Sequence, residues 1–365
     1  MGLQCGIIGI TNVGKTTIFN CMSSTKAQAS NFAFSSNKSN ISIINVPDSR
    51  LDVLQKFQPT EKSVHTTVEI VDIPGLAKGA NKGEGMGNSF LSDIRNCDAL
   101  IHVLRCFDDE NLPHVDGSVD PIRDIENINF ELQVKDLESV EKKIQRFEKL
   151  LKAGDKDAKR GIEVLKIYKD HLESFQSART AEVEESDKRF IADLSLLSTK
   201  PVIYVCNVDE ASAVNGNKYV EKVKELLENE NTEILIIAGK VEADIAELES
   251  EEDRSVFLKD VGLSEPGVNK LIRAAYTLLN LETFFTIGQK ENRAWTIKKG
   301  MTAPQAAGVI HSDLERGFIR AEVIKYNDFI TLGSEHACKE KGKLHIEGKT
   351  YIVDDGDILH IRFNV

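Results

Sequence analysis

Apolar residues in the first 280 positions gather in short, nearly continuous runs. Runs of this length are typical of strands buried on both faces, as in a parallel sheet. Stretches with helical spacing separate them, which indicates an α/β fold with helices on both faces of the sheet. The expected strands are residues 3–10, 64–72, 97–107, 200–207 and 233–240, and a helix at 265–281 is expected to end this sheet domain.

The pattern changes between residues 131 and 197. Apolar residues there recur at steps of three and four, which predicts two amphipathic helices joined by the turn-like run "AGDKDAK" at 153–159. The two helices are expected to form an antiparallel, coiled-coil-like hairpin, with a longer crossover inside the sheet domain as the alternative. The repeating positions are Leu137, Val140, Ile144, Phe147 and Leu151, then Leu165, Tyr168, Leu172 and Phe175.

Two further changes of pattern complete the domain plan. A third helix, with its apolar side chains at 190–197 turned inward, is expected to lead the chain back to the sheet. After residue 281, short alternating strands surround one expected helix at 303–311, which predicts a small α+β module of β-hairpins. The expected domains are therefore a sheet domain at 1–130 and 198–281, a helical insert at 131–197 and a C-terminal domain at 282–365.

Composition narrows the class of protein. The 365 residues are 41% hydrophobic and 28% charged, which is ordinary for a globular chain, and no run of about 18 apolar residues predicts a membrane span. The six cysteines show no CxxC spacing, and the N-terminus does not resemble a signal peptide, so we expect a cytoplasmic protein with reduced thiols. The net charge of −12 argues against nucleic-acid binding by the whole surface but leaves room for local basic faces.

A phosphate-binding loop follows the first expected strand. The run Gly9 to Thr16, "GITNVGKT", fits G-x-x-x-x-G-K-[ST] between a strand and a helix. Backbone N–H groups and the helix N-terminus would face the phosphates. Lys15 could reach the β- and γ-phosphates, and the hydroxyl of Thr16 could bind Mg²⁺.

A second motif lies at the end of another expected strand. Asp72 and Gly75 form "DIPG", as a Walker-B Asp and a switch glycine would, so Asp72 is a candidate for holding Mg²⁺ and Gly75 for meeting the γ-phosphate. The glycine-rich run at 75–87 predicts a mobile loop whose motion γ-phosphate contacts would suppress. A floppy surface loop without switching is the alternative.

Two positions depart from a Ras-like GTPase. Leu76 stands where such a GTPase has the glutamine that orients the attacking water. The run "CNVDE" places Val208 and Glu210 where the guanine-reading Asn-Lys-x-Asp motif has its Lys and its final Asp. Guanine selectivity is therefore expected to be weak, with adenine admitted through backbone groups around Asn207 and Val208, because each unpaired polar group costs about 1–3 kcal/mol.

The chain resembles the YchF/Obg-like ATPase family over nearly its whole length, and the departures at Leu76 and in "CNVDE" are part of this resemblance. The resemblance lies in "GIIGITNVGKTTIFN", "DIPGLAKGANKGEGMGNSFL", "VLRCFDDENLPHVDGSVDPIRDIE", "CNVDE" and "RAWTIKKGMTAPQAAGVIHSDLERGFIRAEVI". It implies a P-loop domain interrupted by a coiled coil, followed by a TGS domain of β-grasp type. It also implies a weak, Mg²⁺-dependent ATPase that prefers ATP to GTP, binds ribosomes and acts in translation or the stress response.

The resemblance also implies roles for individual residues. His114, which would otherwise be an ordinary surface residue, is expected to orient the water. Asn12 corresponds to an Asn associated with K⁺-assisted hydrolysis, with a side chain that only stabilises the loop as the alternative. Three positions depart from the usual family residue: Thr11 replaces Pro, Ser36 replaces the switch-I Thr and Gly239 replaces Ala. The expected nucleotide-binding residues are Asn12, Val13, Gly14, Lys15, Thr16, Thr17, Gly75, Asn207, Val208, Glu210 and Gly239, and the expected Mg²⁺ residues are Thr16, Ser36 and Asp72.

The implied partners are ATP and the ribosome, as the large subunit or the 70S particle, with RNA contacts through the TGS and coiled-coil domains. The protein is expected to be a monomer and to have no membrane partner. Two other functions stay open at this point. One is a ribosome- or RNA-binding factor that a nucleotide gates with negligible turnover, and the other is a GTP-specific switch.

Overall fold

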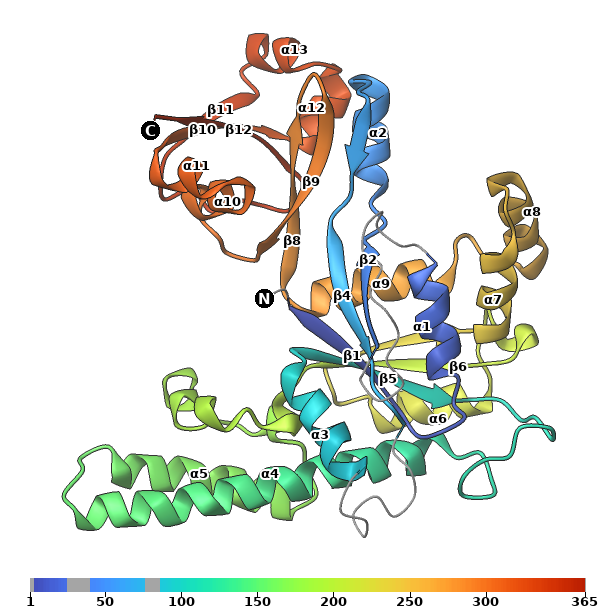
Figure 1. Ribbon diagram of the computed structural model, residues 1–365, viewed down its shortest axis with the longest axis vertical. Coiled ribbons are helices and arrows are strands. Elements are labelled where there is room, and N and C mark those ends of the chain that lie inside the picture. Colours follow the sequence, from blue (N-terminus) through green and yellow to red (C-terminus); the bar gives the residue numbers. More distant parts are fainter. Residues whose placement is uncertain (1–2, 25–39, 76–85, 365) are drawn as a thin grey trace. The chain divides into compact units, whose positions relative to one another are not determined.

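The computed structural model describes residues 3–24, 40–75 and 86–364 (Figure 1), and no side chains of 86–89. Ser36 and Leu76 therefore lie outside the described residues, as does most of the expected glycine-rich loop. The described chain divides into two compact units, one of residues 3–24, 40–42 and 69–268 and the other of residues 43–68 and 269–364.

A six-stranded sheet forms the centre of the first unit, in the order β2-β4-β1-β5-β6-β7. β1 pairs in parallel with β4 and β5, and β5-β6 and β6-β7 are also parallel, which confirms the predicted α/β class. Every residue of β5 and β6 is buried, which explains their continuous apolar runs. The strands are β1 Gln4–Ile8, β2 Asn40–Asn45, β4 Thr67–Asp72, β5 Ala99–Arg105, β6 Val202–Asn207 and β7 Glu233–Ile237.

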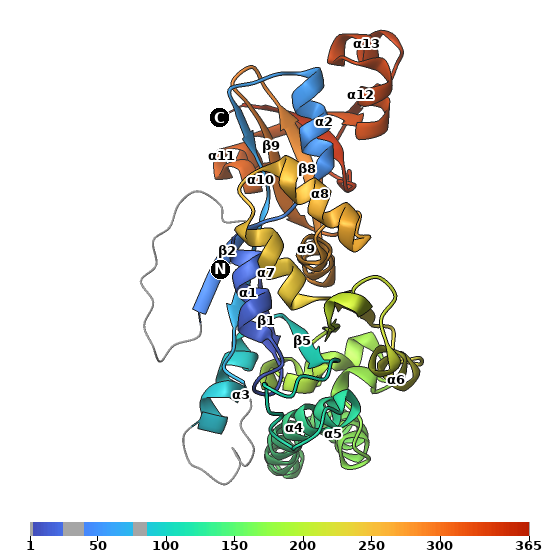
Figure 2. The ribbon, with the colours of Figure 1, turned by 90° about the vertical axis from the view of Figure 1, so that its right-hand side faces the viewer.

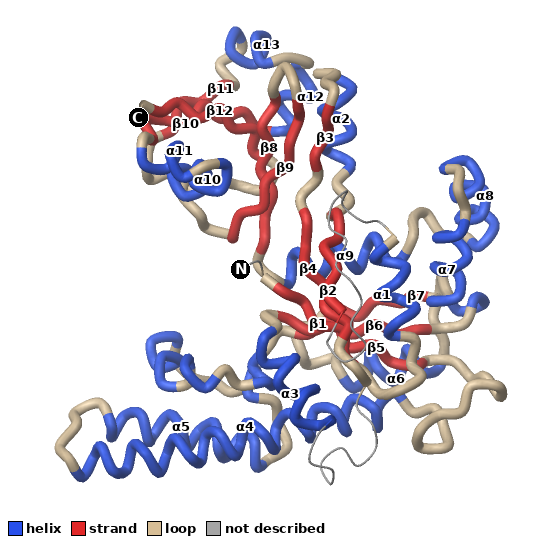
Figure 3. The backbone as a smooth tube through the Cα atoms, in the orientation of Figure 1, coloured by secondary structure: helices blue, strands red, loops and turns tan. Residues whose placement is uncertain are grey.

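Helices connect these strands (Figure 3). The helix expected at 265–281 is present as α9, Gly267–Leu278, which belongs to the second unit from residue 269 onward, and the helix after the phosphate loop is α1, Lys15–Ser23. None of the described helices combines the length and the apolarity needed to cross a bilayer. The remaining helices around the sheet are α3 Met86–Asn96, α6 Lys218–Leu226, α7 Gly239–Glu247 and α8 Glu251–Val261.

The helical hairpin is present as α4, Pro121–Lys152, and α5, Ala158–Glu173, which lie side by side and extend away from the sheet (Figures 1 and 2). The first helix begins well before residue 131, because Asp120 caps it by accepting bonds from the N–H groups of the next turn and Pro121 fills its first position. Val140, Ile144 and Leu165 belong to the core between the two helices.

The expectation of a third helix at 190–197 was wrong. The chain returns to the sheet through short 3-10 turns at Glu185–Phe190, Ala192–Leu194 and Leu197–Thr199, and Ser195 between them has a left-handed φ of 45°. Phe190 and Leu197 are nevertheless buried, as their spacing predicted. The carboxylate of Asp136 on α4 anchors this segment by accepting the N–H groups of Leu197 and Ser198, both at 2.7 Å.

The second unit holds another six-stranded sheet, in the order β11-β10-β12-β8-β9-β3. The expected hairpin pairings β8-β9 and β10-β11 are antiparallel, whereas β12-β8 and β3-β9 are parallel. The expectation of a single helix was wrong, because three helices too short to show a clear period accompany α10. The elements are β3 Lys62–Val64, β8 Leu281–Ile287, β9 Glu291–Lys298, α10 Ala303–Ile310, α11 Ser312–Arg316, β10 Phe318–Lys325, α12 Tyr326–Leu332, α13 Glu335–Glu340, β11 Leu344–Glu347 and β12 Asp357–Phe363.

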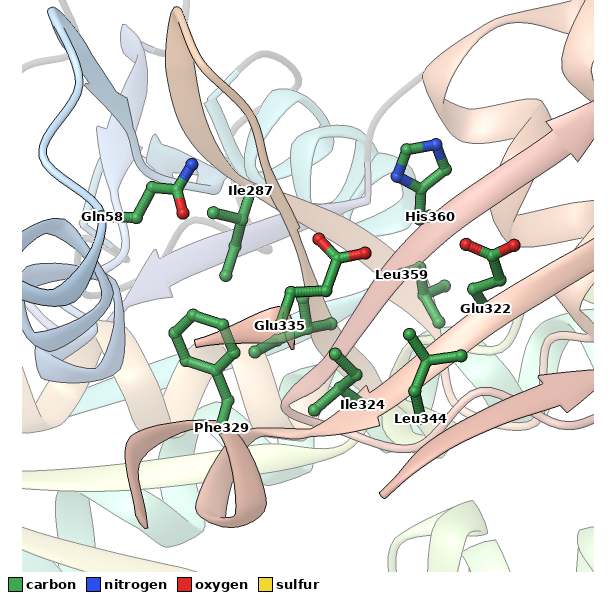
Figure 4. A pocket seen from close by; sticks show the side chains of 10 residues that line it. Gln58, Ile287, Glu322, Ile324, Phe329, Glu335, Leu344, Leu359 and His360 are labelled. Atoms are coloured by element: carbon green, nitrogen blue, oxygen red, sulfur yellow. The ribbon is translucent and has the colours of Figure 1, made fainter. Parts of the chain in front are cut away.

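Residues 43–68 belong to this second unit, although the sequence places them in the nucleotide-binding domain. Leu51 and Leu54 of α2, Ser49–Phe57, are fully buried in a core with Phe285 and Phe329. The side chain of Asn292 donates to the carbonyl of Gln58 at 2.7 Å. A hollow on the same face of the sheet (Figure 4) is lined by Gln58, Ile287, Glu322, Ile324, Phe329, Glu335, Leu344, Ile358, Leu359 and His360.

Candidate nucleotide-binding site

The phosphate loop lies between β1 and α1 and contains three residues with positive φ. Gly9 has a φ of 150°, Asn12 of 63° and Gly14 of 97°. Asparagine tolerates the left-handed region better than most residues, and glycine enters it without penalty. A Cβ on Gly14 would also clash with the side-chain amide of Asn207. The loop therefore needs glycine at this position both for its backbone angle and for space.

Lys15 is buried beneath this loop, with 7% of the residue exposed. Its Nζ donates to the carbonyls of Gly9 at 3.1 Å and Ile10 at 2.6 Å. Burial lowers the pKa of Lys15 to about 8, although the charge of Asp72 opposes this shift. The loop thus holds an ammonium group that the protein alone solvates poorly and that phosphate oxygens would satisfy.

ATP binding is expected to weaken as pH rises above 8. Burial lowers the pKa of Lys15 to about 8 in the free protein, and phosphate oxygens favour the charged form, so binding above this pH takes up one proton. The association constant should then fall by up to about tenfold per pH unit. Calorimetry at pH 7.0 to 9.5 in buffers of different ionisation enthalpy measures both effects. Constant affinity and no proton uptake across this range would contradict the prediction.

Two oxygen ligands for a divalent metal meet beside Lys15. The hydroxyl of Thr16 donates to the carboxylate of Asp72 over 3.4 Å, a long bond that leaves the carboxylate weakly compensated. Burial raises the pKa of Asp72, and the nearby charge of Lys15 opposes this rise. Oxygen atoms of this kind are the ligands that Mg²⁺ prefers, so these residues fit Mg²⁺. Of the three residues predicted to bind Mg²⁺, the structure brings Thr16 and Asp72 together.

The other predicted phosphate residues lie around this pair. Gly75 lies so close to Lys15 that a Cβ added to it would be 2.6 Å from the Nζ of the lysine. Val13 is buried and Thr17 is exposed on α1. Gly75 is therefore the residue through which the segment after Asp72 approaches the lysine.

Asn207 connects three loops at the end of β6. Its Nδ2 donates to the carbonyl of Val13 at 2.8 Å, and its Oδ1 accepts the N–H of Gly239 at 2.9 Å. The residue is only 5% exposed. A Cβ on Gly239 would lie 3.0 Å from this Oδ1, so glycine at 239 relieves a tight contact. Asn207 thus fixes the phosphate loop to the loop that starts α7.

The two residues expected to lie at the base, Val208 and Glu210, differ in their exposure to solvent. Val208 is 3% exposed, and its N–H donates to the carbonyl of Ile237 at 2.9 Å. The carbonyl of Asn207 accepts the N–H of Cys106 at 2.8 Å. The N–H of Val208 is therefore unavailable to adenine unless this bond breaks, whereas the carbonyl of Asn207 keeps a second lone pair. Glu210 is exposed at the start of a 3-10 turn and keeps a carboxylate in the loop.

His114 lies in the loop between β5 and α4 with both ring nitrogens engaged. Its Nδ1 accepts the N–H of Asp116 at 3.1 Å, so the neutral ring carries its proton on Nε2. This Nε2 donates to the buried carboxylate of Asp124 at 3.1 Å, and the His114 side chain is only 3% exposed. Burial raises the pKa of Asp124, and the bond from His114 opposes this rise. In this arrangement His114 has no nitrogen left for a water.

The phosphate loop reaches the His114 loop through Asn12. Its Nδ2 donates to the carbonyl of Pro113 at 3.3 Å. This contact places the residue before His114 beside the phosphate loop, and only the Oδ1 of Asn12 could bind a cation such as K⁺. Sequence reasoning missed the partners Pro113, Asp116 and Asp124. The run "VDPIRD" signals a helix start that puts Asp124 in the first turn, but nothing in it indicates the bond to His114.

Comparisons with known proteins agree with this architecture. Residues 4–153 match a family model described as "50S ribosome-binding GTPase". Residues 281–364 match a model named YchF-GTPase_C, described as a protein of unknown function.

Two curated relatives match over their full length. "Ribosome-binding ATPase YchF" of Bacillus subtilis is 48% identical over 367 residues, and the protein of the same name from Escherichia coli O157:H7 is 48% identical over 365 residues, with 100% of each chain covered. The solved structure of the Schizosaccharomyces pombe YchF GTPase superposes with a TM-score of 0.87 at 35% identity, covering 99% of this chain and 98% of that one. Identity at this level over the whole length, together with the phosphate loop, Asp72 and the altered base loop, shows that the chain belongs to the YchF family.

Proposed function

We infer that this protein is a ribosome-binding ATPase that hydrolyses ATP to ADP and phosphate. The observation that carries this inference is the convergence of Lys15, Thr16 and Asp72 around one phosphate loop, in a chain whose relatives are named ribosome-binding ATPases. Within a P-loop fold these groups serve phosphoryl transfer, which depends on positioning and on stabilising negative charge.

Different residues of the chain bind the phosphates, hold the metal and position the phosphate loop. Lys15 and the amides of the phosphate loop bind the phosphates and stabilise the charge that develops on them. Thr16 and Asp72 would hold Mg²⁺, which neutralises charge on the β- and γ-phosphates when it is bound. Asn207 keeps the loop in the conformation that presents these groups. Ser36 is proposed as a further Mg²⁺ residue, and the Oδ1 of Asn12 as a K⁺ ligand.

ATP is the proposed substrate in preference to GTP. A guanine-reading aspartate accepts two hydrogen bonds from the base, whereas Glu210 is longer and Val208 is packed inside the protein. The loop therefore lacks the feature that would favour guanine strongly. Thr17, Gly75 and Gly239 complete the proposed nucleotide site.

His114 is the proposed residue for orienting the water, once it leaves Asp124. We expect His114→Ala to lower the turnover number by about tenfold to a hundredfold, with the affinity for ATP unchanged, since positioning a reacting group of this kind is worth that much or more. Asp124→Asn weakens the bond that holds the ring and should not lower turnover. Single-turnover hydrolysis and ATP titrations separate the two parameters. Wild-type turnover in His114→Ala would contradict the assignment.

The function is tested by measuring γ-phosphate release from ATP and from GTP, with and without purified ribosomes. We expect release from ATP to exceed release from GTP and to respond to ribosomes. Competition calorimetry of ATP against GTP then tests the base preference independently of turnover. A marked preference for GTP in both assays would favour a GTP-specific switch instead.

A nucleotide-gated binding factor is the second candidate. The bonds that His114 accepts from the N–H of Asp116 and donates to Asp124 favour it, because they hold the proposed water-orienting group in an inactive position. Co-sedimentation with ribosomes in a non-hydrolysable ATP analogue and in ADP distinguishes the two. Different binding in the two nucleotides combined with negligible turnover would support the factor.

We also propose the domain plan 1–130 with 198–281, 131–197 and 282–365, the last as a TGS domain. The protein is proposed to act as a cytoplasmic monomer in translation or the stress response. RNA contacts are proposed through the coiled-coil and TGS domains, on the large subunit or the 70S particle.

A further inference from the structure

The hollow in the second unit carries three side chains of the kinds that bind metal ions. Glu322, Glu335 and His360 line it together with apolar side chains such as Ile324 and Phe329 (Figure 4). One carboxylate oxygen from each glutamate and one ring nitrogen of the histidine all lie within 4.8 Å of one another. A mostly apolar hollow with a few convergent polar groups is the usual form of a ligand site.

These three side chains come from three different elements. Glu322 on β10 and His360 on β12 stand directly opposite each other in the antiparallel pair, so the sheet fixes their spacing. Glu335 is the first residue of α13, and the hydroxyl of Ser334 caps this helix by accepting the N–H of Ala337 at 3.2 Å. The three residues are far apart in the sequence, so only the folded chain forms this group.

The existing bonds of the three side chains leave room for a metal ion. Glu322, whose side chain is 13% exposed, accepts bonds from Nε and Nη2 of Arg362, both at 3.0 Å, and Nη2 of Arg320 lies 3.8 Å from it. A carboxylate has about four lone-pair positions, so Glu322 can still bind a metal while Arg362 orients it. The side chains of Glu335 and His360 are exposed and form no hydrogen bond or ion pair with any residue that the structure describes.

The imidazole nitrogen decides which metal fits. Zn²⁺ binds histidine nitrogen and carboxylate oxygen at about 2.0–2.2 Å, often with three protein ligands and one open position, whereas Mg²⁺ prefers oxygen ligands. Ligand atoms around a tetrahedral zinc ion lie about 3.3 Å apart, so the three side chains need to approach one another by at most about 1.5 Å. Glu335 and His360 are exposed and can do this by rotating about their side-chain bonds.

The other group of metal-binding side chains in the described part of the chain already encloses a cation of the protein. It consists of His114, Asp116 and Asp124. The guanidinium of Arg123 lies 3.4 Å from Nδ1 of His114, 3.7 Å from the carboxylate of Asp116 and 3.8 Å from that of Asp124. In the hollow, by contrast, the nearby guanidinium groups contact only one of the three side chains. The hollow therefore fits an added cation better.

We propose that Glu322, Glu335 and His360 form a zinc-binding site in the second unit. The bound ion ties α13 to β10 and β12 and leaves one coordination position for water or for an oxygen of a small molecule in the hollow. The site shares no residue with the nucleotide site, where Thr16 and Asp72 offer oxygen atoms only. The proposal is therefore independent of the proposed ATPase function.

The test measures Zn²⁺ binding to the full chain by calorimetry at neutral pH. The protein is first freed of metals with a chelator, and excess Mg²⁺ is present to occupy oxygen-only sites. His360→Gln and Glu335→Gln each remove one ligand. His336→Gln is the matched control, because His336 is an exposed histidine of α13 that pairs with Glu340 at 3.3 Å. All three substitutions are at exposed positions, so the variants should stay folded, which their melting temperatures without metal check.

We expect the wild type and the control to bind Zn²⁺ with equal affinity, and His360→Gln and Glu335→Gln to bind it at least about tenfold more weakly, since even a group that only orients a metal ligand contributes this much. Zn²⁺ should raise the melting temperature of the first two proteins more than that of the other two, because binding to the folded state stabilises it. Equal affinity in all four proteins, or no binding by the wild type, would overturn the proposal. So would binding that His114→Ala abolishes and His360→Gln retains, which would place the zinc in the other group.

Discussion

Replacing Lys15 by alanine is expected to lower ATP hydrolysis by about a hundredfold to a thousandfold. The side chain is the buried cation of the phosphate loop, and removing one preorganised group that stabilises developing charge costs this much in other enzymes. Lys222→Ala, which removes one exposed lysine from α6, is the control. Phosphate release in the presence and absence of ribosomes measures the effect.

The same variant carries a second expectation that separates catalysis from folding. Burial lowers the pKa of Lys15 to about 8, so the charged form is less favourable in the folded protein than in the unfolded chain, and at neutral pH the charge opposes folding. Lys15→Ala should therefore not lower the melting temperature. Activity equal to that of Lys222→Ala, in a folded protein, would refute the role of Lys15.

Replacing Asn207 by alanine is expected to weaken ATP binding by about tenfold to a hundredfold and to lower the free energy of unfolding by about 2–4 kcal/mol. The variant leaves the carbonyl of Val13 and the N–H of Gly239 buried without partners, and each such group costs about 1–3 kcal/mol. The phosphate loop would also lose its attachment to β6. Calorimetric titration with ATP and urea denaturation measure the two effects.

Asn217 provides the matched control for this prediction. Its Nδ2 donates to the carbonyl of Cys106 at 2.7 Å and to the hydroxyl of Ser212 at 3.3 Å, and its Oδ1 accepts the N–H groups of Tyr219 and Val220. Asn217→Ala therefore removes at least as many side-chain bonds from the same unit as Asn207→Ala does. It does not touch the phosphate loop, and we expect it to reduce stability while ATP affinity is retained. Equal losses of affinity in both variants would show that Asn207 acts through general stability alone.

The strands that the sequence predicted correctly are those with a strong local signal. β5 and β6 are buried on both faces and therefore appear as continuous apolar runs. The strand β2, which has only one buried residue, and the helices α12 and α13 carry no such signal. Their positions depend on the surfaces they cover, as with Phe329 of α12, which packs into the core that also holds Leu51.

By itself the sequence determined the nucleotide chemistry of this protein. The phosphate loop, Asp72 and the altered run "CNVDE" are local motifs, in which residue type and spacing fix the backbone shape and the available donors. The helical hairpin likewise followed from spacing alone, because its two helices are neighbours in the chain.

Only the tertiary structure decided which distant groups meet. It placed residues 43–68 in the C-terminal unit, joined Asn207 to Val13 and Gly239, and engaged both nitrogens of His114. The physical reason is that buried polar groups must find partners wherever folding brings them, and burial makes an unmatched group expensive. The spacing of residues in the sequence does not indicate those partners, so the hydrogen bonds of Asn207 and His114 followed only from the tertiary structure.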